Sequence, residues 1–451
     1  MLSTYQEALD YLENRKPQNF EKLFQGDKSL IRVKKLLETL GNPQEKLKVI
    51  HVAGTSGKGS TVYYLAKILE SCGFKVGSTV SPSIYDFLER FQINSLDLSQ
   101  VKFLSYVNEI IPTIEQLEAQ IDETYTFYEL VTILAFYIFE KEAVDYAIIE
   151  TGLGGLLDAT NAVSNPTKIN VLTTIDFDHT EILGKKLSDI AAQKAGIIQE
   201  NQVVFSIEQS IPAKETIEKK CLQTTSKLYF VNAGTKGDLN YNHVKTNEFG
   251  TKFNVKINGE WINDIILGQI GDFQAGNCTL ALAVCAYLRI RDNFKIDFES
   301  IKPTLRKLKI PGRFEKFKYQ DRDLILDMAH NPHKIKGLVQ LLQKISPRQT
   351  YNIIFATAHS KDSLAMLKLL QPITEELVLT RYSSQSEDIA KSSQEINKLE
   401  EIAKSIEAFD QSKIQTNHSL SSSLSLVIAK NSKPILVVGS AFLVKEVKEL
   451  C

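Results

Sequence analysis

The chain has 451 residues, of which 43% are hydrophobic and 24% are charged, and its 53 basic and 54 acidic side chains give a formal net charge of -1. This composition is typical of a soluble globular protein that can bury full cores, and the length suggests three domains or two larger ones. The balanced charge gives no electrostatic reason to expect nucleic acid or an anionic membrane as a partner.

The cysteines and the apolar runs indicate the compartment. Five cysteines, odd in number and widely spaced, argue against a disulfide framework or a zinc site and favour a reducing compartment. The longest apolar run, residues 130–139, is about half the ~20 residues that a membrane span requires. Residues 1–16 lack the apolar core of a signal peptide. We therefore expect a cytoplasmic protein with no membrane contact, and we expect a monomer.

Short apolar runs alternate with helical patterns in the first part of the chain. This alternation predicts right-handed crossovers and a parallel sheet. The helix predicted from residue 60 has an apolar face and ends before Gly73. Buried strands are predicted over 48–54, 74–80, 144–150 and 168–175, and helices over 60–72 and 127–141.

The chain changes character after residue 228 and then returns to alternation. Residues 228–267 suggest antiparallel hairpins, and residues 291–315 look like a connector with one short helix. We expect two domains, 1–297 and 298–451. The remaining predictions are strands over 323–329, 351–358, 376–380 and 434–440, and helices near 273–288, after Pro332, from Ser363 and over 419–427.

A glycine-rich loop follows the first predicted strand in "VAGTSGKGST", residues 52–61. It departs from the common nucleotide loop G-x-x-x-x-G-K-[ST], because Gly59 separates Lys58 from Ser60 and Val52 stands in place of the first glycine. Backbone N–H groups at such a turn can cradle an anion, Lys58 can add charge at the β- and γ-phosphates, and Ser60 can offer a hydroxyl. The alternative is a glycine-rich turn with no ligand.

Glu150 ends a predicted buried strand in "AIIETGLGGLLDATN", residues 147–161, and a glycine-rich turn follows it. In an open α/β sheet, ligands bind at the carboxyl ends of the strands, and Mg²⁺ prefers hard oxygen ligands. Glu150 is therefore a candidate ligand of the magnesium ion that ATP chemistry requires. A solvated acid at a strand end is the alternative.

Several motifs, in chain order, resemble those of one family. "HVAGTSGKGS" is similar to H-V-A-G-T-N-G-K-G-S of the Mur ligase superfamily, and more narrowly of the folylpolyglutamate synthase/dihydrofolate synthase family. Residues 150–161 resemble E-V-G-L-G-G-R-L-D-A-T-N, and residues 325–332 resemble I-x-D-x-A-H-N-P. The resemblance implies an α/β fold: a P-loop-containing central domain of the Mur ligase type with a mostly parallel sheet, and a smaller Rossmann-like α/β domain at the C-terminus.

The resemblance also implies cofactors and residue roles. The cofactors are ATP and Mg²⁺, and the family carbamylates the lysine that corresponds to Lys194, which converts an ammonium into an anionic oxygen ligand. Catalytic roles are implied for Lys58, Glu150, His179, Lys194 and His330, and metal ligation for Ser81, Glu150, His179 and Lys194. ATP contacts are implied for Gly54, Thr55, Ser56, Gly57, Lys58, Gly59, Ser60, Asn277, Arg313 and Asp327. Substrate contacts are implied for Thr126, Tyr128, Glu129, Asp158, Ala159, His330 and Ser440.

Some of these assignments have plain structural alternatives. Without the resemblance, His179 would be an ordinary core or surface histidine. Tyr128 stands where the family has Phe; its ring can stack on a flat pterin or belong to a helix core. Further departures from the family motifs are Leu156 for Arg, Ser83 for His, Gln193 for Glu and Ser360 for Asp.

These features together predict an ATP-dependent ligase that adds L-glutamate to folates, with dihydropteroate left open as a further acceptor. A substrate carboxylate would attack the γ-phosphate, and the amine of glutamate would then attack the acyl phosphate. Two alternatives stay open: another Mur-type acid–amino-acid ligase, such as a cell-wall precursor enzyme, and a nucleotide-binding homologue that no longer ligates. The phosphate loop starts too early in the chain for the N-terminal domain that cell-wall enzymes usually carry.

Overall fold

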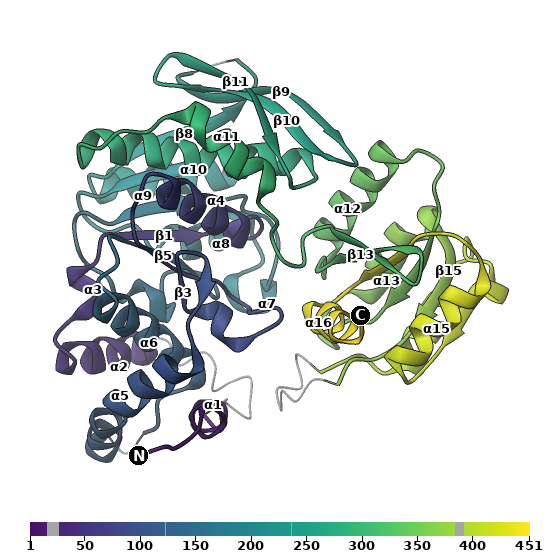
Figure 1. Cartoon of the computed structure of the whole chain (residues 1–451), viewed down its shortest axis with the longest axis horizontal. Helices are drawn as coiled ribbons and strands as arrows, with labels where there is room; N and C mark the ends of the chain where they lie inside the picture. Colours follow the sequence, from purple (N-terminus) through teal and green to yellow (C-terminus); the bar gives the residue numbers. More distant parts are fainter. Residues whose placement is uncertain (16–26, 122, 236, 384–391) are drawn as a thin grey trace. The chain divides into compact units, whose positions relative to one another are not determined.

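The computed structural model describes residues 1–15, 27–121, 123–235, 237–383 and 392–451. These residues form two compact units (Figure 1). The first unit comprises Met1–Lys245, Thr251–Gly268 and Asp272–Leu308, and the second comprises Thr246–Gly250, Gln269–Gly271 and Lys309–Cys451. The domain division expected after residue 297 stays a prediction. No helix among the described residues is long and apolar enough to cross a membrane.

The first unit is built on a large, mostly parallel sheet. Its strands are β1 (Val49–Ala53), β2 (Val76–Thr79), β3 (Gln92–Ile93), β4 (Leu96–Asp97), β5 (Tyr146–Glu150), β6 (Ile169–Leu172), β7 (Val203–Ile207), β8 (Lys227–Ala233), β9 (Leu239–Asn247), β10 (Gly250–Ile257) and β11 (Glu260–Leu267). Their order is β11-β10-β9-β8-β7-β6-β1-β5-β2-β3-β4. The run from β2 through β5, β1, β6 and β7 to β8 is parallel, as the alternating pattern predicts.

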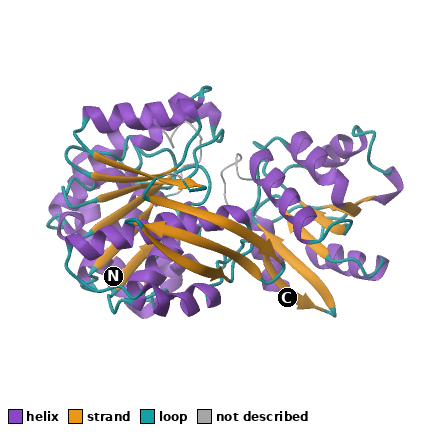
Figure 2. Ribbon diagram, turned by 90° about the horizontal axis from the view of Figure 1, so that it is seen from above, coloured by secondary structure: helices purple, strands orange, loops and turns teal. Residues whose placement is uncertain are grey.

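The helices of the first unit are α1 (Tyr5–Glu13), α2 (Asp27–Thr39), α3 (Pro43–Lys46), α4 (Lys58–Ser71), α5 (Gln100–Ile121), α6 (Phe127–Lys141), α7 (Thr180–Leu183), α8 (Leu187–Ala195), α9 (Ile211–Gln223), α10 (Asp272–Arg291) and α11 (Phe298–Lys307), with short 3₁₀ turns η2 (Phe87–Arg90) and η3 (Ala159–Ala162). Helices cover both faces of the sheet (Figure 2). Val49 and Ala53 of β1 share one face because strand side chains alternate; Val49 packs with α1, α2, α5 and α6, and Ala53 packs with α8 and α9. Helices α4 and α10 pack against each other on the opposite face.

The second unit is a smaller α/β sheet. Its strands are β12 (Glu315–Tyr319), β13 (Arg322–Asp327), β14 (Tyr351–Phe355), β15 (Thr374–Leu379), β16 (Ile414–Thr416) and β17 (Ile435–Val438), in the order β12-β13-β17-β14-β15-β16. All neighbours are parallel except β12 and β13. Its helices are α12 (Pro332–Ile345), α13 (Ser363–Leu370), α14 (Ile396–Lys404), α15 (Leu420–Lys430) and α16 (Ala441–Leu450), with 3₁₀ turns η4 (Gln371–Ile373) and η6 (Gln411–Lys413).

The outer strand β11 pairs irregularly with β10. The register shifts between Phe253 and Val255, and Asp264 on β11 has a positive φ of 59°. Lys252 Nζ pairs with Asp264 Oδ1 at 2.7 Å beside the shift. Such a bulge bends the strand at the border of the sheet.

Most predicted elements are confirmed. The helix predicted over 127–141 coincides with α6, and the strand predicted over 48–54 contains β1. Helix α5 was not predicted; Pro112 lies inside it, and a proline weakens the sequence signal for a helix. Strand β12 was also missed, because its half-exposed residues follow the mixed-charge connector.

Candidate active site

The phosphate loop joins β1 to α4 and is shaped by its glycines. Gly57 has a φ of +93°, which an L side chain rarely adopts. A Cβ at Gly57 would lie 2.5 Å from Asn277 Oδ1, and one at Gly54 would collide with the hydroxyl of Thr173. Asn277, the expected ATP contact on α10, therefore packs directly on the loop.

Some donors of this loop are used by the protein and others are open. The N–H groups of Thr55 and Ser56 donate to Thr174 O at 2.8 and 3.2 Å, and the Thr55 hydroxyl donates to Asp176 O at 2.9 Å. Ser56 Oγ is buried and has no hydrogen-bond partner among the described residues. No side chain caps the start of α4. The loop thus offers helix N–H groups and a hydroxyl, a donor set suited to phosphate.

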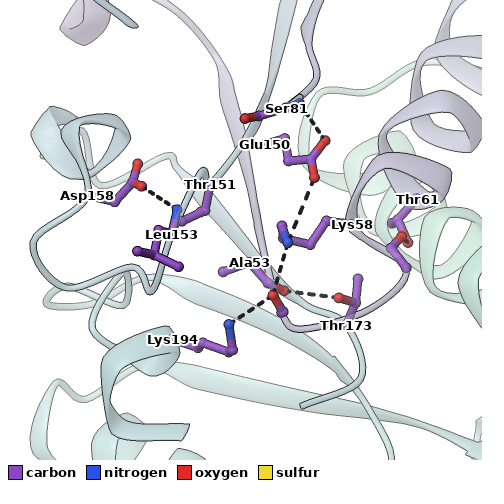
Figure 3. Close-up of polar contacts among 12 residues, drawn as sticks. Ala53, Lys58, Thr61, Ser81, Glu150, Thr151, Leu153, Asp158, Thr173 and Lys194 are labelled. Carbon is purple, nitrogen blue, oxygen red and sulfur yellow. Dashed lines mark hydrogen bonds and ion pairs between the residues drawn. The ribbon is translucent and has the colours of Figure 1, made fainter. Parts of the chain in front are cut away.

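Two lysines converge on the carbonyl at the start of the loop (Figure 3). Lys58 Nζ donates to Gly54 O at 3.2 Å, and Lys194 Nζ from α8 donates to the same oxygen at 2.9 Å. Lys194 is only 4% exposed. Two ammonium groups on one carbonyl concentrate positive charge beside the loop, which favours a polyanionic ligand.

Glu150, at the carboxyl end of β5, meets the loop that follows β2. Its Oε1 lies 3.9 Å from Lys58 Nζ, and its Oε2 accepts from the Ser81 N–H at 3.1 Å (Figure 3). The structure thus brings two expected metal ligands together. No group of three or more His, Cys, Asp or Glu side chains in the described ranges could hold a metal alone. One carboxylate and a hydroxyl fit Mg²⁺, which binds few protein groups and completes its shell with water and phosphate oxygens.

His179 precedes α7 and has a positive φ of 49°. Its ring nitrogens lie 3.9 Å from Asp178 Oδ1 and 3.8 Å from Glu181 Oε1. The role of His179 as a metal ligand stays a prediction.

Helix α10 adds a polar row beside the first turn of α4. Gln274 Nε2 donates to Ser60 Oγ at 3.5 Å, and Asn277 Nδ2 donates to Gln274 Oε1 at 3.3 Å. A Cβ on Gly59 would lie 3.3 Å from Glu150 Oε2. The absence of a side chain at Gly59 therefore lets the helix start approach the carboxylate closely.

Asp158 is buried immediately before η3 and accepts four hydrogen bonds. Its Oδ1 accepts from Thr160 Oγ1 at 2.5 Å, from the Thr160 N–H at 3.0 Å and from the Tyr128 hydroxyl at 3.3 Å. Its Oδ2 accepts from the Leu153 N–H at 2.8 Å (Figure 3). Burial raises the pKa of Asp158 above its ordinary value, and the donors oppose that shift. Ala159, the next residue, is also buried.

Thr126 and Glu129, expected to contact substrate, form the capping box of α6. The Glu129 N–H donates to Thr126 Oγ1 at 3.3 Å, and the Thr126 N–H donates to Glu129 Oε2 at 2.8 Å. Glu129 Oε1 also pairs with Arg32 Nη2 at 2.8 Å, and Glu129 is 1% exposed. Both side chains have structural partners, and their contact with substrate stays a prediction.

A small cavity connects the phosphate side of the site to Tyr128. Glu150 and Ser81 line it from the strand ends, and Tyr128 and Thr160 line it from α6 and η3. Arg90 also lines it; its Nε is buried with no hydrogen-bond partner among the described residues, and burial lowers its pKa. The cavity has a volume of about 10 Å³, room for about one water molecule, so an organic ligand at this place requires the lining side chains to move.

In the second unit, Asp327 ends β13 and is held by backbone donors. It accepts from the Phe314 N–H at 2.9 Å and from the Ala329 N–H at 2.8 Å. Burial raises the pKa of Asp327, and the charge of Arg313 opposes the rise. Two expected ATP contacts of this unit, Arg313 and Asp327, therefore lie close enough to interact.

His330 and Ser440 follow the carboxyl ends of β13 and β17, which are adjacent strands. His330 Nδ1 lies 2.8 Å from Met328 O, and its Nε2 lies 3.2 Å from Lys334 Nζ. Ser440 caps α16 by accepting from the Phe442 N–H at 3.2 Å. The sheet thus presents both residues at one edge.

Sequence reasoning missed His51 in β1. This histidine is fully buried, and its Nε2 lies 2.8 Å from Thr160 Oγ1 and 3.0 Å from Thr151 Oγ1. A polar residue inside an otherwise apolar strand is the signal that could have found it, because buried polar groups need partners.

Comparisons with known proteins match both units. The family model of the Mur ligase middle domain matches residues 52–285, and that of the dihydrofolate synthetase C-terminal domain matches residues 309–450. The first match covers more than half of the chain.

Relatives and solved structures agree with these matches. The chain is 31% identical over 366 residues to a dihydrofolate synthetase of Saccharomyces cerevisiae (79% of this chain, 81% of the relative) and 29% identical over 396 residues to a dihydrofolate synthase/folylpolyglutamate synthase of Bacillus subtilis (87% and 88%). It is 28% identical to a solved folylpolyglutamate synthase of Thermotoga maritima, with a TM-score of 0.82 over 99% of this chain and 96% of that one. A folylpolyglutamate synthase–AMPPCP–folate complex is 26% identical, with a TM-score of 0.81 over 99% of each chain. The chain belongs to the folylpolyglutamate synthase/dihydrofolate synthase family of the Mur ligases.

Proposed function

We propose that this chain is an ATP-dependent ligase that joins the amine of L-glutamate to a carboxylate of a folate. The observation that carries the proposal is the meeting of Lys58, Lys194 and Glu150 at the phosphate loop, a set of charges suited to the phosphates of ATP and a magnesium ion. A pterin acid is flat at one end and carries a carboxylate at the other. Tyr128 and Glu150 line the same small cavity, so the pterin would lie on the Tyr128 side and the carboxylate on the side of the phosphate loop once the lining side chains move.

The chemistry proceeds in two displacements. The acceptor carboxylate oxygen attacks the γ-phosphorus of ATP, the bond to the β-phosphate oxygen breaks, and ADP leaves. The glutamate amine then attacks the acyl carbon, loses a proton, and inorganic phosphate leaves. Lys58 and the open N–H groups of α4 would bind the transferred phosphoryl group and stabilise its charge.

Mg²⁺ fits beside Glu150 and Ser81, and it would supply charge neutralisation on the phosphates when bound. We assign His179 and a carbamylated Lys194 to metal binding as well. A carbamate on Lys194 would replace one of the two ammonium groups beside Gly54 O with an anionic oxygen ligand. Asp158, Tyr128, Ala159, Thr126 and Glu129 would face the acceptor, and Arg90 would face its carboxylate.

Residues of the second unit complete the proposed assignment. In this unit Arg313 and Asp327 are proposed to contact ATP, and His330 and Ser440 are proposed to contact glutamate; in the first unit Asn277 is proposed to contact ATP. The enzyme is proposed to be a cytoplasmic monomer; its five cysteines are free, as in proteins of reducing compartments.

Dihydropteroate is the second candidate acceptor. The yeast relative, which is 31% identical, is named a dihydrofolate synthetase, and the family model that matches residues 309–450 carries the same name. An enzyme that accepts dihydropteroate uses the same two displacements at the carboxylate of an acceptor that is shorter than folate.

A phosphate-release assay tests the proposal. Purified protein is incubated with ATP, Mg²⁺ and L-glutamate, and dihydropteroate, tetrahydrofolate or a muramyl nucleotide is added as the acceptor. We expect release that requires glutamate and a pterin acid, and we expect Lys58→Ala to abolish it. Turnover only with the muramyl nucleotide, or none with any acceptor, would overturn the proposal.

A further inference from the structure

A chain of buried polar groups runs from strand β1 to Asp158. His51 is 0% exposed in β1, and its Nε2 lies 2.8 Å from Thr160 Oγ1. The Thr160 hydroxyl in turn lies 2.5 Å from Asp158 Oδ1. Strand β1 and η3 are far apart in sequence, so this series of hydrogen-bonded groups exists only in the folded protein.

The direction of the hydrogen bonds follows from the number of protons. Thr160 has one hydroxyl proton, and the carboxylate of Asp158 can only accept it when ionised. With Asp158 ionised, the oxygen of Thr160 therefore accepts from His51, and the proton of a neutral imidazole sits on Nε2, where Thr151 Oγ1 at 3.0 Å can share it. Burial, with a smaller contribution from the charge of Lys168, lowers the pKa of His51 well below its ordinary value, which keeps the ring neutral. His51 Nδ1 is buried and has no hydrogen-bond partner in the described part of the chain, which is consistent with a ring nitrogen that carries no proton.

The two oxygens of Asp158 are unequal as a result. Oδ1 receives three donors, the hydroxyl and N–H of Thr160 and the hydroxyl of Tyr128, whereas Oδ2 receives only the Leu153 N–H. Burial raises the pKa of the Tyr128 hydroxyl well above its ordinary value, so that group stays protonated and donates. An oxygen with three donors, such as Oδ1, has no lone pair left for a ligand. Oδ2 has only one donor and keeps one lone pair.

We infer that His51 and Thr160 are positioning residues that fix the Asp158 carboxylate so that Oδ2 alone accepts an N–H group of the pterin ring. This inference rests on the proposed function, because it assumes that Asp158 faces the acceptor. Tyr128, which stands where the family has Phe, adds a third donor to Oδ1 and restricts the carboxylate further. Tyr128 and Thr160, whose hydroxyls both donate to Asp158, also line the small cavity beside Glu150, which would have to widen to admit the ring.

Substitutions at Thr160 test the inference directly. Thr160→Val keeps the volume and removes the hydroxyl, which frees the carboxylate to rotate. We expect the KM for dihydropteroate or folate to rise on the order of tenfold, the low end of what a hydrogen bond to a charged group is worth. The KM for ATP should stay within about twofold, since the phosphate loop keeps its own contacts. Thr160→Ser restores the hydroxyl and should restore the acceptor KM.

A binding measurement separates positioning from stability. Calorimetric titration with dihydropteroate should show a weaker Kd for Thr160→Val by the same factor, with the unfolding midpoint recorded for every variant. Thr224→Val serves as a matched control, because Thr224 is a buried threonine whose hydroxyl bonds Lys220 O at the end of α9, away from the cavity lining. That control should lose stability without weakening dihydropteroate binding.

The outcomes are distinguishable. A wild-type acceptor KM and Kd in Thr160→Val would overturn the inference, as would equal losses in Thr160→Ser and Thr160→Val or an equal rise in the KM for ATP. If the wild-type protein turns over no pterin acid, the proposed function fails, and this inference fails with it. If the wild type is active and only the Thr160→Val result is absent, the proposed function stands and the positioning role is wrong.

Discussion

Gly57 combines a positive φ of +93° with a neighbour, Asn277 Oδ1, that a Cβ would approach to 2.5 Å. We expect Gly57→Ala to weaken binding of an ATP analogue at least tenfold, because both the backbone and Asn277 must move. Gly73 is a matched control: it has a φ of +89°, but nothing lies within 4 Å of its Cβ position. Gly73→Ala should lose about 1 kcal/mol of stability and keep its affinity. Calorimetric titration with AMPPCP measures the affinity of the two variants. Equal affinities of Gly57→Ala and Gly73→Ala would contradict the steric argument.

Lys168 is a buried lysine whose Nζ donates to Val163 O at 3.1 Å and to Ile197 O at 2.9 Å. Burial lowers its pKa from 10.5 to about 7. Between these two pKa values the unfolded chain holds a proton that the folded chain has released, so the free energy of unfolding rises with pH in this window. Below the window Lys168 is protonated in both states and adds no pH dependence to the free energy of unfolding. The steepest slope is about 1.4 kcal/mol per pH unit.

Lys168→Met removes this titration. We expect the difference in unfolding free energy between wild type and Lys168→Met to move in favour of the wild type as the pH rises from 7 to 9. The single tryptophan, Trp261 in the first unit, gives a fluorescence signal for urea unfolding. Parallel stability curves for the two proteins would show that Lys168 does not titrate in this range.

Helix α6 begins with a capping box that joins Thr126 and Glu129, and it carries Tyr128 into the site. Thr126→Ala removes the cap and should cost about 1 kcal/mol of unfolding free energy, whereas Thr126→Ser should cost little. If Thr126 also touches the acceptor, as proposed, the KM for the pterin acid should rise in the alanine variant beyond what the stability loss explains. An unchanged KM with reduced stability would restrict Thr126 to capping.

The first unit as a whole should respond to nucleotide through β1 and α4. Ligand that binds only the folded state stabilises it by RT ln(1 + [L]/Kd), about 2.7 kcal/mol at a ligand concentration of 100 Kd. Hydrogen exchange followed by mass spectrometry should show slower exchange over residues 49–71 with AMPPCP and Mg²⁺. Chelation of Mg²⁺ should remove most of this protection, since Glu150 and Ser81 would then face bare phosphates. Protection that is insensitive to the metal would argue against the proposed magnesium position.

Local motifs and long-range contacts differ in how far the sequence predicts them. The strand, loop and helix around Lys58 are contiguous, so their sequence pattern was sufficient, and the same holds for Glu150 at its strand end. The contact of His51 with Thr160 depends on the pairing of β1 with β5 and on the turn that follows, and no local pattern encodes that register. Likewise, the sequence alone did not show that Asn277 packs on Gly57.

The bulged outer strand β11 has a consequence for self-association. The last strand of an open sheet carries unpaired backbone groups that can template the addition of a foreign strand. The register shift, the left-handed Asp264 and the Lys252–Asp264 ion pair interrupt the flat surface that such templating needs. The opposite border, β4, has only two residues. The two edge strands of this wide sheet are therefore poor templates for strand addition, and the enzyme should resist polymerisation through them.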